Sequence, residues 1–263
     1  MEKIGFIGMG NMAQALCAGF IKSGKASQIE AFAPNQEKLK ANAEKFGFTP
    51  RASVTELVDS CGIIIMACKP YQIVSVLSQV RSNLAGKALV SVAAGWGFAK
   101  YETFVEKSTR VQFVMPNTPA MVGAGVMLFE KTNSLREDER KELMDLFSSV
   151  GIVEELEDSL MGIGGAVAGC GPAFVDLFIE AYADAAVKYG ISRTTAYKLV
   201  SQTLLGSAKL QLQTGTHPAM LKDAVCSPGG TTIRGVSALE KAGFRDACIS
   251  SIDAIMEKKQ ADK

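Results

Sequence analysis

The chain has 263 residues, a hydrophobic content of 48% and a formal net charge of +1, which suits one large or two modest globular domains. No basic block argues for nucleic acid or an anionic membrane surface. The longest apolar runs are broken by glycine, and the N-terminus lacks a signal-peptide pattern, so we expect no segment that spans a bilayer.

Cysteine and histidine usage argues against metal and disulfide chemistry. The six cysteines are scattered without a CxxC pair, a pattern typical of free thiols in the reducing cytoplasm. The single histidine, His217, lies in a turn-like Thr-His-Pro, and a mechanism that needs a histidine base would depend on it alone. We therefore expect a cytoplasmic protein without a metal centre, in which His217 has a structural role.

The N-terminal segment carries the fingerprint of a dinucleotide-binding fold. A buried strand over 4–7 runs into the pattern G-x-G-x-x-A, and a helix follows to about Ser23. The first glycine permits a tight turn, the second lets a pyrophosphate approach the backbone, and the alanine lets the helix pack close to the strand. We predict a dinucleotide site formed by Gly8, Met9, Gly10, Asn11, Met12 and Ala13.

The end of the second predicted strand, 28–33, bears on the choice of cofactor. NAD-preferring folds place a carboxylate there for the ribose 2′-hydroxyl, and none occurs in Phe32-Ala33-Pro34-Asn35. Asn35 and Lys38 could instead receive a 2′-phosphate, which favours NADPH over NADH. Asn35 could also cap the predicted helix 36–46, and the two roles are compatible.

Strands and helices continue to alternate as far as residue 156. We expect a weak strand near 48–51, a helix over 53–59 capped by Ser53 with Glu56 at the capping-box position, and a central buried strand over 62–68. The remaining elements are a helix at about 71–82, strands at 88–92, 111–114 and 125–129, a helix at 136–150 and a short strand to residue 154. Together they predict a doubly wound α/β domain of Rossmann type over residues 1–156.

Three loops should border the nucleotide, because ligands bind beyond the carboxyl ends of parallel strands. They follow the strands 62–68, 88–92 and 111–114. Small residues in the second loop leave room for a ring. The predicted cofactor contacts are Ala67, Cys68, Lys69, Pro70, Ala93, Ala94, Gly95 and Asn117.

Beyond residue 157 the pattern becomes helical. We expect helices at about 158–168, 172–189, 193–214, 218–225, 231–241 and 244–259, with a turn over 168–172 starting the longest apolar one. The faces mix bulky and small apolar side chains, which predicts an all-α domain over 157–263 that packs against a second subunit. A self-contained helical bundle remains the alternative.

One loop stands out in this half of the chain, Ser227-Pro228-Gly229-Gly230-Thr231-Thr232, which leads directly into the helix 231–241. Successive glycines let backbone N–H groups converge, and the helix dipole adds positive potential at that point. The loop could hold a small anion, or it could be an ordinary helix cap.

In chain order, these motifs resemble the pyrroline-5-carboxylate reductase family. The resemblance covers nearly the whole chain: Gly8 to Ala13, Lys69-Pro70, Arg110 with 115–119, Gly169 to Ala173, and 217–240. The run from His217 to Thr232 is its most specific part. The family implies a Rossmann domain, a helical domain that interlocks in a dimer, sometimes in larger rings, and NAD(P)H-dependent reduction of a cyclic imine to L-proline.

The resemblance also implies residue roles. The loop would hold the substrate carboxylate through backbone amides, and Thr232, the predicted catalytic residue, would hydrogen-bond the ring nitrogen. The implied substrate-binding set is Asp158, Asp223, Ser227, Gly229, Gly230, Thr231 and Thr232. Cys170 and Cys226 stand where the family commonly has small hydroxyl residues, and 49–53 departs from its asparagine-bearing pattern, which puts one adenosine contact in doubt.

Hydride transfer to a cyclic imine suits these residues. The imine is partly protonated near neutral pH, so the reaction needs positioning more than a strong acid. One alternative is a β-hydroxyacid dehydrogenase, but no lysine occurs between Lys141 and Lys188 to serve as its catalytic lysine. Another is a noncatalytic NADPH-binding sensor, which would not need an intact Ser227–Thr232 loop.

Overall fold

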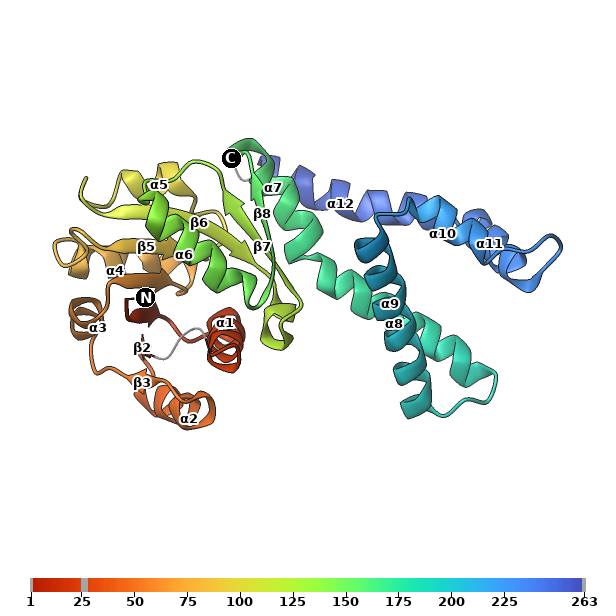
Figure 1. Ribbon diagram of the computed structural model, residues 1–263, viewed down its shortest axis with the longest axis horizontal. Coiled ribbons are helices and arrows are strands. Elements are labelled where there is room, and N and C mark those ends of the chain that lie inside the picture. The colour runs from red at the N-terminus through yellow and green to blue at the C-terminus, as the bar shows by residue number, and fades with distance from the viewer. Residues whose placement is uncertain (1, 25–27, 262–263) are drawn as a thin grey trace. The chain divides into compact units, whose positions relative to one another are not determined.

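The computed structural model describes residues 2–24 and 28–261 (Figure 1). The chain separates into two compact units, one that ends at Pro172 and one that begins at Ala173. The segment 157–172, which the sequence pattern groups with the helical half, therefore belongs to the first unit. The two predicted domains also included residues 1, 25–27 and 262–263, which lie outside the described residues.

Within its described residues, the first unit contains one eight-stranded sheet with the order β3-β2-β1-β4-β5-β6-β7-β8. Strands β1 to β6 are parallel, β7 is antiparallel to β6, and β8 is parallel to β7. This confirms the predicted doubly wound α/β domain of Rossmann type. The strands are β1 (Ile4–Ile7), β2 (Ile29–Phe32), β3 (Thr49–Pro50), β4 (Ile63–Met66), β5 (Ala88–Ser91), β6 (Arg110–Pro116), β7 (Gly125–Glu130) and β8 (Gly151–Leu156).

Helices cover both faces of the sheet because successive strand residues point to opposite sides. On one face Phe6 of β1 packs in a cluster with Phe20 and Phe147, and on the other Ile7 packs with Leu57 and Leu77. Two of these aromatic rings, Phe20 and Phe147, meet edge to face at 5.2 Å. The helices are α1 (Asn11–Lys22), α2 (Gln36–Phe46), α3 (Val54–Ser60), η1 (Pro70–Gln72), α4 (Ile73–Val80), α5 (Phe98–Glu102), η2 (Thr118–Val122) and α6 (Glu137–Ser148).

The predicted cap of α3 is confirmed. The N–H of Glu56 donates to Ser53 Oγ at 3.1 Å. The Glu56 carboxylate reaches back to the N–H of Ala52 at 3.2 Å rather than to that of Ser53, so the reciprocal bond lies one residue earlier than in a capping box.

A helical segment closes the first unit and continues into the second. It comprises η3 (Asp158–Leu160), α7 (Met161–Gly164) and the π-helical turn η4 (Gly165–Gly169), followed by α8 (Gly171–Lys188). Met161 and Ala168 pack against Leu128 and Leu156 of β7 and β8. A Cβ on Gly164 would lie 2.5 Å from Leu156 Cδ1, so glycine permits the close approach.

The turn predicted over 168–172 is reduced to a bend at Cys170, between η4 and α8. Gly169 and Pro172 are helical, and the N–H of Cys170 donates to the Gly165 carbonyl at 3.2 Å in a wide π turn. Glycine and proline usually interrupt a helix, but here packing on the sheet holds the glycine-rich segment in helical form.

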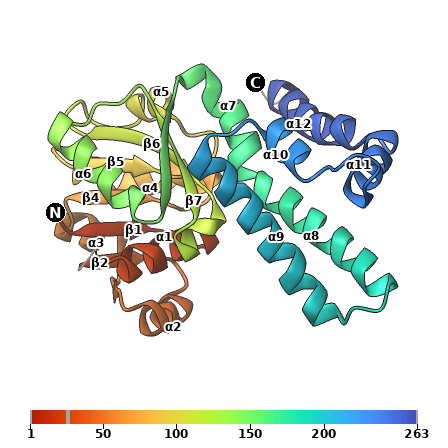
Figure 2. The same ribbon diagram turned by 45° about the vertical axis from the view of Figure 1, so that its right-hand side comes forward.

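The second unit is entirely helical in its described part. After α8 come α9 (Arg193–Thr214), α10 (Pro218–Ala224), α11 (Thr231–Lys241) and α12 (Phe244–Ala261), close to the predicted ranges. Helices α8 and α9 cross in the view of Figure 1 and run alongside each other in the turned view of Figure 2. The ring of Phe178 on α8 stacks on that of Tyr182 with their centroids 4.3 Å apart, and its centroid lies 6.2 Å from that of Phe244.

Apolar side chains on this unit are largely uncovered in the single chain. Among its described residues only Ala183 and Ala196 are buried, whereas Leu177 and Leu212 are 64% and 69% exposed. Apolar surface of this extent is typical of a surface that another chain covers.

The expectation that no apolar run could span a bilayer is wrong on length and composition. The helical stretch Asp158–Lys188 is long and apolar enough to cross a membrane, with a mean hydropathy of 1.5 in its most apolar window. The glycines that seemed to divide it do not end the helix.

Candidate active site

A groove of about 750 Å³ lies beyond the carboxyl ends of β1, β2, β4 and β5. It brings together most of the predicted cofactor-binding residues, from four separate stretches of the chain. These are Gly8, Met9, Gly10, Asn11 and Met12, then Asn35 and Lys38, then Ala67, Cys68, Lys69 and Pro70, and finally Ala93 and Ala94.

The two glycines of the fingerprint have different roles. Gly8 has a φ of +96°, and a Cβ there would lie 2.8 Å from Cys68 N and 2.9 Å from the Ala67 carbonyl. Gly10 has an ordinary φ of −77°, and a Cβ there would meet no atom within 4 Å. Gly8 thus lets β1 turn beside β4, whereas Gly10 leaves open the space above the helix.

The start of α1 is suited to a pyrophosphate. Its N-cap is Gly10, whose position offers no side chain to cap the first turn, and that turn contains no acidic residue. The free N–H groups at this end and the helix dipole therefore face the groove without a competing carboxylate. The residues present fit a dinucleotide cofactor.

No carboxylate is among the described residues that line the groove near Asn35 and Lys38, where the ribose is expected. Asn35 and Lys38 both line it, and Asn35 Oδ1 also accepts the N–H of Lys38 at 2.9 Å, so Asn35 caps α2 as one of its two predicted roles. The acidic residue of β2, Glu30, is 4% exposed and is bound by Arg51, Lys3 and Ser60. It is not among the residues that line the groove.

Three predicted cofactor contacts do not line this groove. Ala13 is 1% exposed and packs in the core, and Gly95 follows the lining residue Ala94 with a φ of +74°. Asn117 is 6% exposed, and both ends of its side-chain amide bind backbone: Nδ2 donates to the Ala168 carbonyl at 3.0 Å, and Oδ1 accepts the N–H of Val126 at 2.9 Å. The cofactor role of these three residues stays a prediction.

Some lining residues were missed by the sequence analysis, notably Gln72, Val76 and Thr118. Gln72 and Val76 are four residues apart on the helical segment that Pro70 begins, a spacing that places them on one face. Thr118 directly follows Asn117 in the motif 115–119. The four-residue spacing of Gln72 and Val76 and the position of Thr118 in this motif could both have been recognised in the sequence.

Cys68 contributes an unreactive thiol to the groove. Burial raises its pKa to about 11, so the thiol is neutral near pH 7 and is a poor nucleophile. The described residues also contain no group of three or more side chains of His, Cys, Asp or Glu placed to hold a metal ion.

Hydrogen bonds made by two buried polar side chains, Ser91 and Glu130, hold the loop after β5. Ser91 Oγ donates to the Trp96 carbonyl at 3.0 Å, and Glu130 accepts the N–H of Phe98 at 2.7 Å. Burial raises the pKa of the Glu130 carboxyl, with the nearby Asp158 adding to the shift. These contacts fix the short segment that contributes Ala93 and Ala94.

In the second unit, Ser227 to Gly230 form a tight turn that opens α11. The N–H of Gly230 donates to the Ser227 carbonyl at 3.0 Å, and Gly229 has a φ of +71°. Proline followed by a residue of positive φ is the signature of a type II turn. A Cβ on Gly230 would lie 2.4 Å from Ser227 Oγ and 3.1 Å from the Ser227 carbonyl oxygen, so the serine side chain would have to rotate to admit it.

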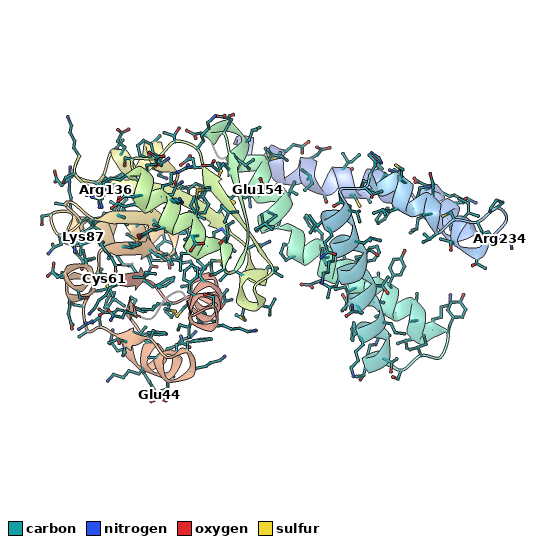
Figure 3. The ribbon with its side chains drawn as sticks, viewed as in Figure 1. Glu44, Cys61, Lys87, Arg136, Glu154 and Arg234 are labelled. Carbon is teal, nitrogen blue, oxygen red and sulfur yellow. The ribbon has the colours of Figure 1, made fainter. Side chains whose placement is uncertain are left out.

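This turn leaves the start of α11 open. The N-cap is Gly230, without a side-chain cap, and no acidic residue occupies the first turn. Thr231 and Thr232 are exposed on that turn in the single chain, and Arg234 of the same helix is labelled in Figure 3. The loop thus has the free N–H groups of an anion site and no carboxylate to occupy them.

The two predicted aspartates lie in different units. Asp223, on α10, is exposed and paired with Lys222. Asp158 begins η3 in the first unit, and its Oδ1 accepts the N–H of Thr132 at 3.1 Å.

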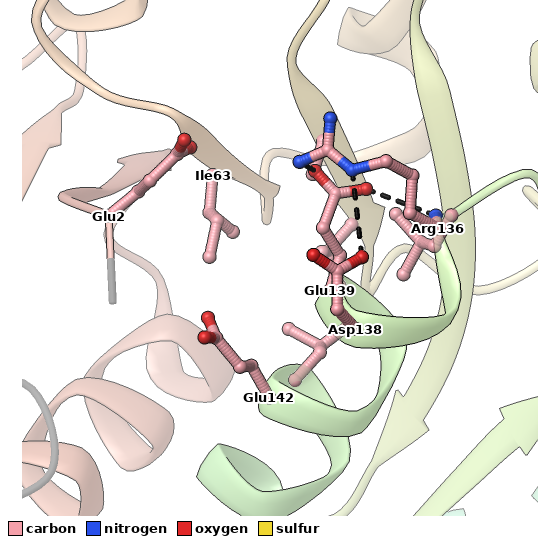
Figure 4. Close-up of a pocket in the computed structure, with 10 residues that line it drawn as sticks. Glu2, Ile63, Arg136, Asp138, Glu139 and Glu142 are labelled. Carbon is pink, nitrogen blue, oxygen red and sulfur yellow. Dashed lines mark hydrogen bonds and ion pairs between the residues drawn. The ribbon is translucent and has the colours of Figure 1, made fainter.

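A second pocket of about 420 Å³ lies beside α6 and the starts of β4 and β5 (Figure 4). Carboxylates from Glu2, Asp138, Glu139 and Glu142 line it. Glu139 is already engaged by Arg110 at 2.6 Å and by Arg136 at 2.7 Å. This pocket has neither the glycine turn nor the open helix start of the groove, so we place no cofactor there.

Comparisons with known proteins agree with this geometry. Residues 158–262 match the family model "Pyrroline-5-carboxylate reductase dimerisation", and residues 3–95 match "NADP oxidoreductase coenzyme F420-dependent". The pyrroline-5-carboxylate reductase of Treponema pallidum is 43% identical, with 96% of this chain and 98% of that protein covered. The Escherichia coli enzyme of the same name is 39% identical, with 98% and 97% covered.

Solved structures give the same result. The Plasmodium falciparum pyrroline carboxylate reductase with NADP bound superposes with a TM-score of 0.89 at 34% identity, covering 99% of this chain and 97% of that one. The Streptococcus pyogenes 1-pyrroline-5-carboxylate reductase gives 0.86 at 31% identity, with 99% and 98% covered. The chain therefore belongs to the pyrroline-5-carboxylate reductase family.

Proposed function

We propose that this protein reduces 1-pyrroline-5-carboxylate to L-proline with NADPH, the last step of proline biosynthesis. The main observation behind the proposal is the groove. The uncapped start of α1 faces it where a pyrophosphate would bind, and its lining residues include no carboxylate that would bind a ribose 2′-hydroxyl. Identity of about two-fifths with pyrroline-5-carboxylate reductases along nearly the whole chain supports it. NADP is also named for the family model of residues 3–95 and for the Plasmodium structure.

When bound, NADPH supplies a hydride to the imine carbon, the ring nitrogen retains or takes up one proton, and NADP⁺ and proline result. The chain's own task is to bind, orient and shield the reactants from water. No strong acid is needed, since the protonated imine is already electrophilic. This explains why a protein with one histidine, and with a neutral thiol in its groove, can carry out the reaction.

We assign the substrate carboxylate to the loop Ser227–Thr232. Its converging amides, the uncapped start of α11 and Arg234 one turn further on all favour an anion. Thr232 would hydrogen-bond the ring nitrogen, and Asp223 and Asp158 would border the substrate. The family resemblance supports the roles of Thr232, Asp223 and Asp158.

The working form is proposed to be a homodimer in the cytoplasm. The uncovered apolar side chains of α8 and α9 need a partner surface, and the family model that covers them is one of dimerisation. We attribute the exposed apolar side chains of α8 within the stretch 158–188 to the interface rather than to a membrane or a nucleic-acid partner, while Met161 and Ala168 pack on the sheet. A ring of dimers would also satisfy these faces, and a mass measurement in solution separates the two forms.

The test is to follow the loss of NADPH absorbance with pyrroline-5-carboxylate as substrate, with NADH in parallel. We expect turnover with both cofactors and a higher kcat/KM with NADPH. A protein that binds NADPH but turns over no five- or six-membered cyclic imine would be a sensor rather than a reductase. The β-hydroxyacid dehydrogenase alternative is disfavoured, because α8 has a lysine only at its last position.

A second experiment asks whether one active site draws on two chains. Subunits disabled at Gly10 would be mixed with subunits disabled at Thr232. Recovered activity in the mixture requires a shared site, whereas its absence in a mixture shown to contain heterodimers places both halves in one chain.

A further inference from the structure

The side-chain amide of Asn117 connects two segments that are 51 residues apart in sequence. Asn117 follows β6 and precedes Thr118, which lines the nucleotide groove. Its Oδ1 accepts the N–H of Val126 at the start of β7, and its Nδ2 donates to the Ala168 carbonyl in the π-helical turn. The side chain is nearly buried, at 6% exposure, so water does not compete strongly for these bonds.

The Ala168 carbonyl needs this donor for a reason that the sequence makes plain. In a regular α-helix it would accept the N–H of residue 172, four positions further on. That residue is Pro172, which has no N–H. Asn117 therefore supplies from the sheet the donor that the helix lacks.

The bond is placed where the first unit ends. Pro172 is its last residue, and α8 continues through this point into the second unit. Gly164 and Ala168 pack against β7 and β8, so apolar contacts hold this segment on the sheet. The hydrogen bond from Asn117 Nδ2 to the Ala168 carbonyl, which we call the Asn117 pin, adds a polar contact at the end of the segment.

We propose that Asn117 is a positioning residue that fixes the exit of the chain from the nucleotide-binding unit, rather than a cofactor ligand. The inference rests on the proposed function, in which the first unit holds NADPH and the second carries the substrate loop. Removing the Asn117–Ala168 hydrogen bond should then lower kcat/KM for the imine substrate while leaving NADPH binding in the groove unchanged.

The main variant is Asn117→Asp, which keeps the acceptor for Val126 and, when ionised, replaces the donor to Ala168 with a carboxylate oxygen that repels the carbonyl. We expect the NADPH dissociation constant, measured by fluorescence without substrate, to stay within about twofold of the wild type. We expect kcat/KM for pyrroline-5-carboxylate to fall about tenfold or more. Hydrogen exchange of the amides at 170–173, excluding Pro172, should accelerate, while exchange in β1 and β4 stays unchanged.

Asn133→Asp is the matched control. Asn133 also binds backbone with both amide ends, donating to the Lys131 carbonyl at 3.0 Å and accepting the N–H of Leu135 at 3.1 Å, but it is only half-buried and its bonds are local. The same chemical change there should leave exchange at 170–173 and kcat/KM unaltered.

A rescue isolates the missing donor. Asn117→Ala removes both bonds, and adding Pro172→Ala returns an N–H to the helix for the Ala168 carbonyl. The double variant should regain protection at 170–173 and much of the lost kcat/KM, while the Val126 amide still exchanges fast.

Three results would overturn the proposal: a rise in the NADPH dissociation constant that matches the loss of activity, unchanged exchange at 170–173 in Asn117→Asp, or no rescue by Pro172→Ala. Nucleotide binding and exchange are measured without the imine. A wild-type protein that fails to reduce pyrroline-5-carboxylate would refute the proposed function separately from the pin.

Discussion

The carboxylate of Glu30 grips the guanidinium of Arg51 through two hydrogen bonds of 2.6 and 2.8 Å, in a position where Glu30 is almost completely buried. Glu30 lies on β2, the strand that leads to the ribose end of the groove, and Arg51 follows β3. Bidentate pairs of this kind are stronger than single ion pairs. The pair therefore ties β2 to the edge strand β3, next to the segment that carries Asn35 and Lys38.

Acid should weaken this anchor. The Arg51 hydrogen bonds, with help from Ser60 and Lys3, lower the pKa of Glu30 from 4.5 to about 2 against the opposing effect of burial. Because the folded pKa is depressed, the stabilisation is complete above about pH 4.5 and is lost as the pH falls toward 2. A shift of this size corresponds to about 3 kcal/mol at neutral pH. Urea unfolding at fixed protein concentration measures this loss of stability. The pH is varied from 6 to about 2, a range that covers both the ordinary and the lowered pKa of Glu30.

Glu30→Gln should lower the free energy of unfolding at neutral pH by about 3 kcal/mol and flatten its dependence on pH in that window. Glu56→Gln is the control, since Glu56 binds the same guanidinium at 2.9 Å but its side chain is 45% exposed. We expect a loss below about 1 kcal/mol there. Equal losses in the two variants would contradict the importance of burial.

The two glycines of the fingerprint should fail in different ways when each is changed to alanine. Gly8→Ala forces a side chain into positive φ and against the backbone of Ala67 and Cys68, so we expect about 2 kcal/mol or more of lost stability. Gly10→Ala places a methyl group in open space, so stability should change by less than about 1 kcal/mol. Its NADPH dissociation constant should rise about tenfold or more, because the methyl occupies space that the pyrophosphate needs.

Urea unfolding and NADPH titration of both variants decide the matter. Tight NADPH binding by Gly10→Ala would show that the cofactor does not approach this part of the backbone.

Local patterns predicted much of the fold and of the groove. The first glycine turn, the Ser53 cap and the ends of β4 and β5 follow from neighbours within a few residues, and such signals are legible in one sequence. The helices α9 to α12 were also close to their expected bounds, because their apolar spacing is regular and glycine or proline marks their ends.

What the sequence analysis missed depends on contacts between distant residues. The mostly helical path through 165–172 is supported by the sheet and by Asn117. Because these contacts are distant in sequence, the local pattern of glycines and a proline predicted a longer turn. The backbone bonds of the Asn117 amide are equally invisible locally, since its partners lie 9 and 51 residues away.

Cofactor preference should respond to Lys38. Its exposed ammonium lines the groove at the ribose end, and we expect it to attract a 2′-phosphate. Lys38→Met should raise the KM for NADPH about tenfold, a value in keeping with one charge-assisted hydrogen bond, and leave the KM for NADH nearly unchanged. Lys40→Met is the control, because Lys40 is exposed on the same helix and does not line the groove. A parallel loss with NADPH and NADH would assign Lys38 a role other than phosphate recognition.

Thr232 should contribute one hydrogen bond rather than proton chemistry. It occupies the second position of α11, and its hydroxyl is exposed in the single chain. A neutral hydrogen bond of about 1 to 2 kcal/mol predicts that Thr232→Ala lowers kcat by about tenfold, and that Thr232→Ser recovers most of it. Thr194→Ala is the matched control, since Thr194 holds the same second position on α9 and is also exposed. Steady-state kinetics at saturating NADPH gives the comparison. Complete inactivation of a folded, NADPH-binding Thr232→Ala variant would mean that the hydroxyl takes part in the chemical step, and an unchanged kcat would remove Thr232 from the site.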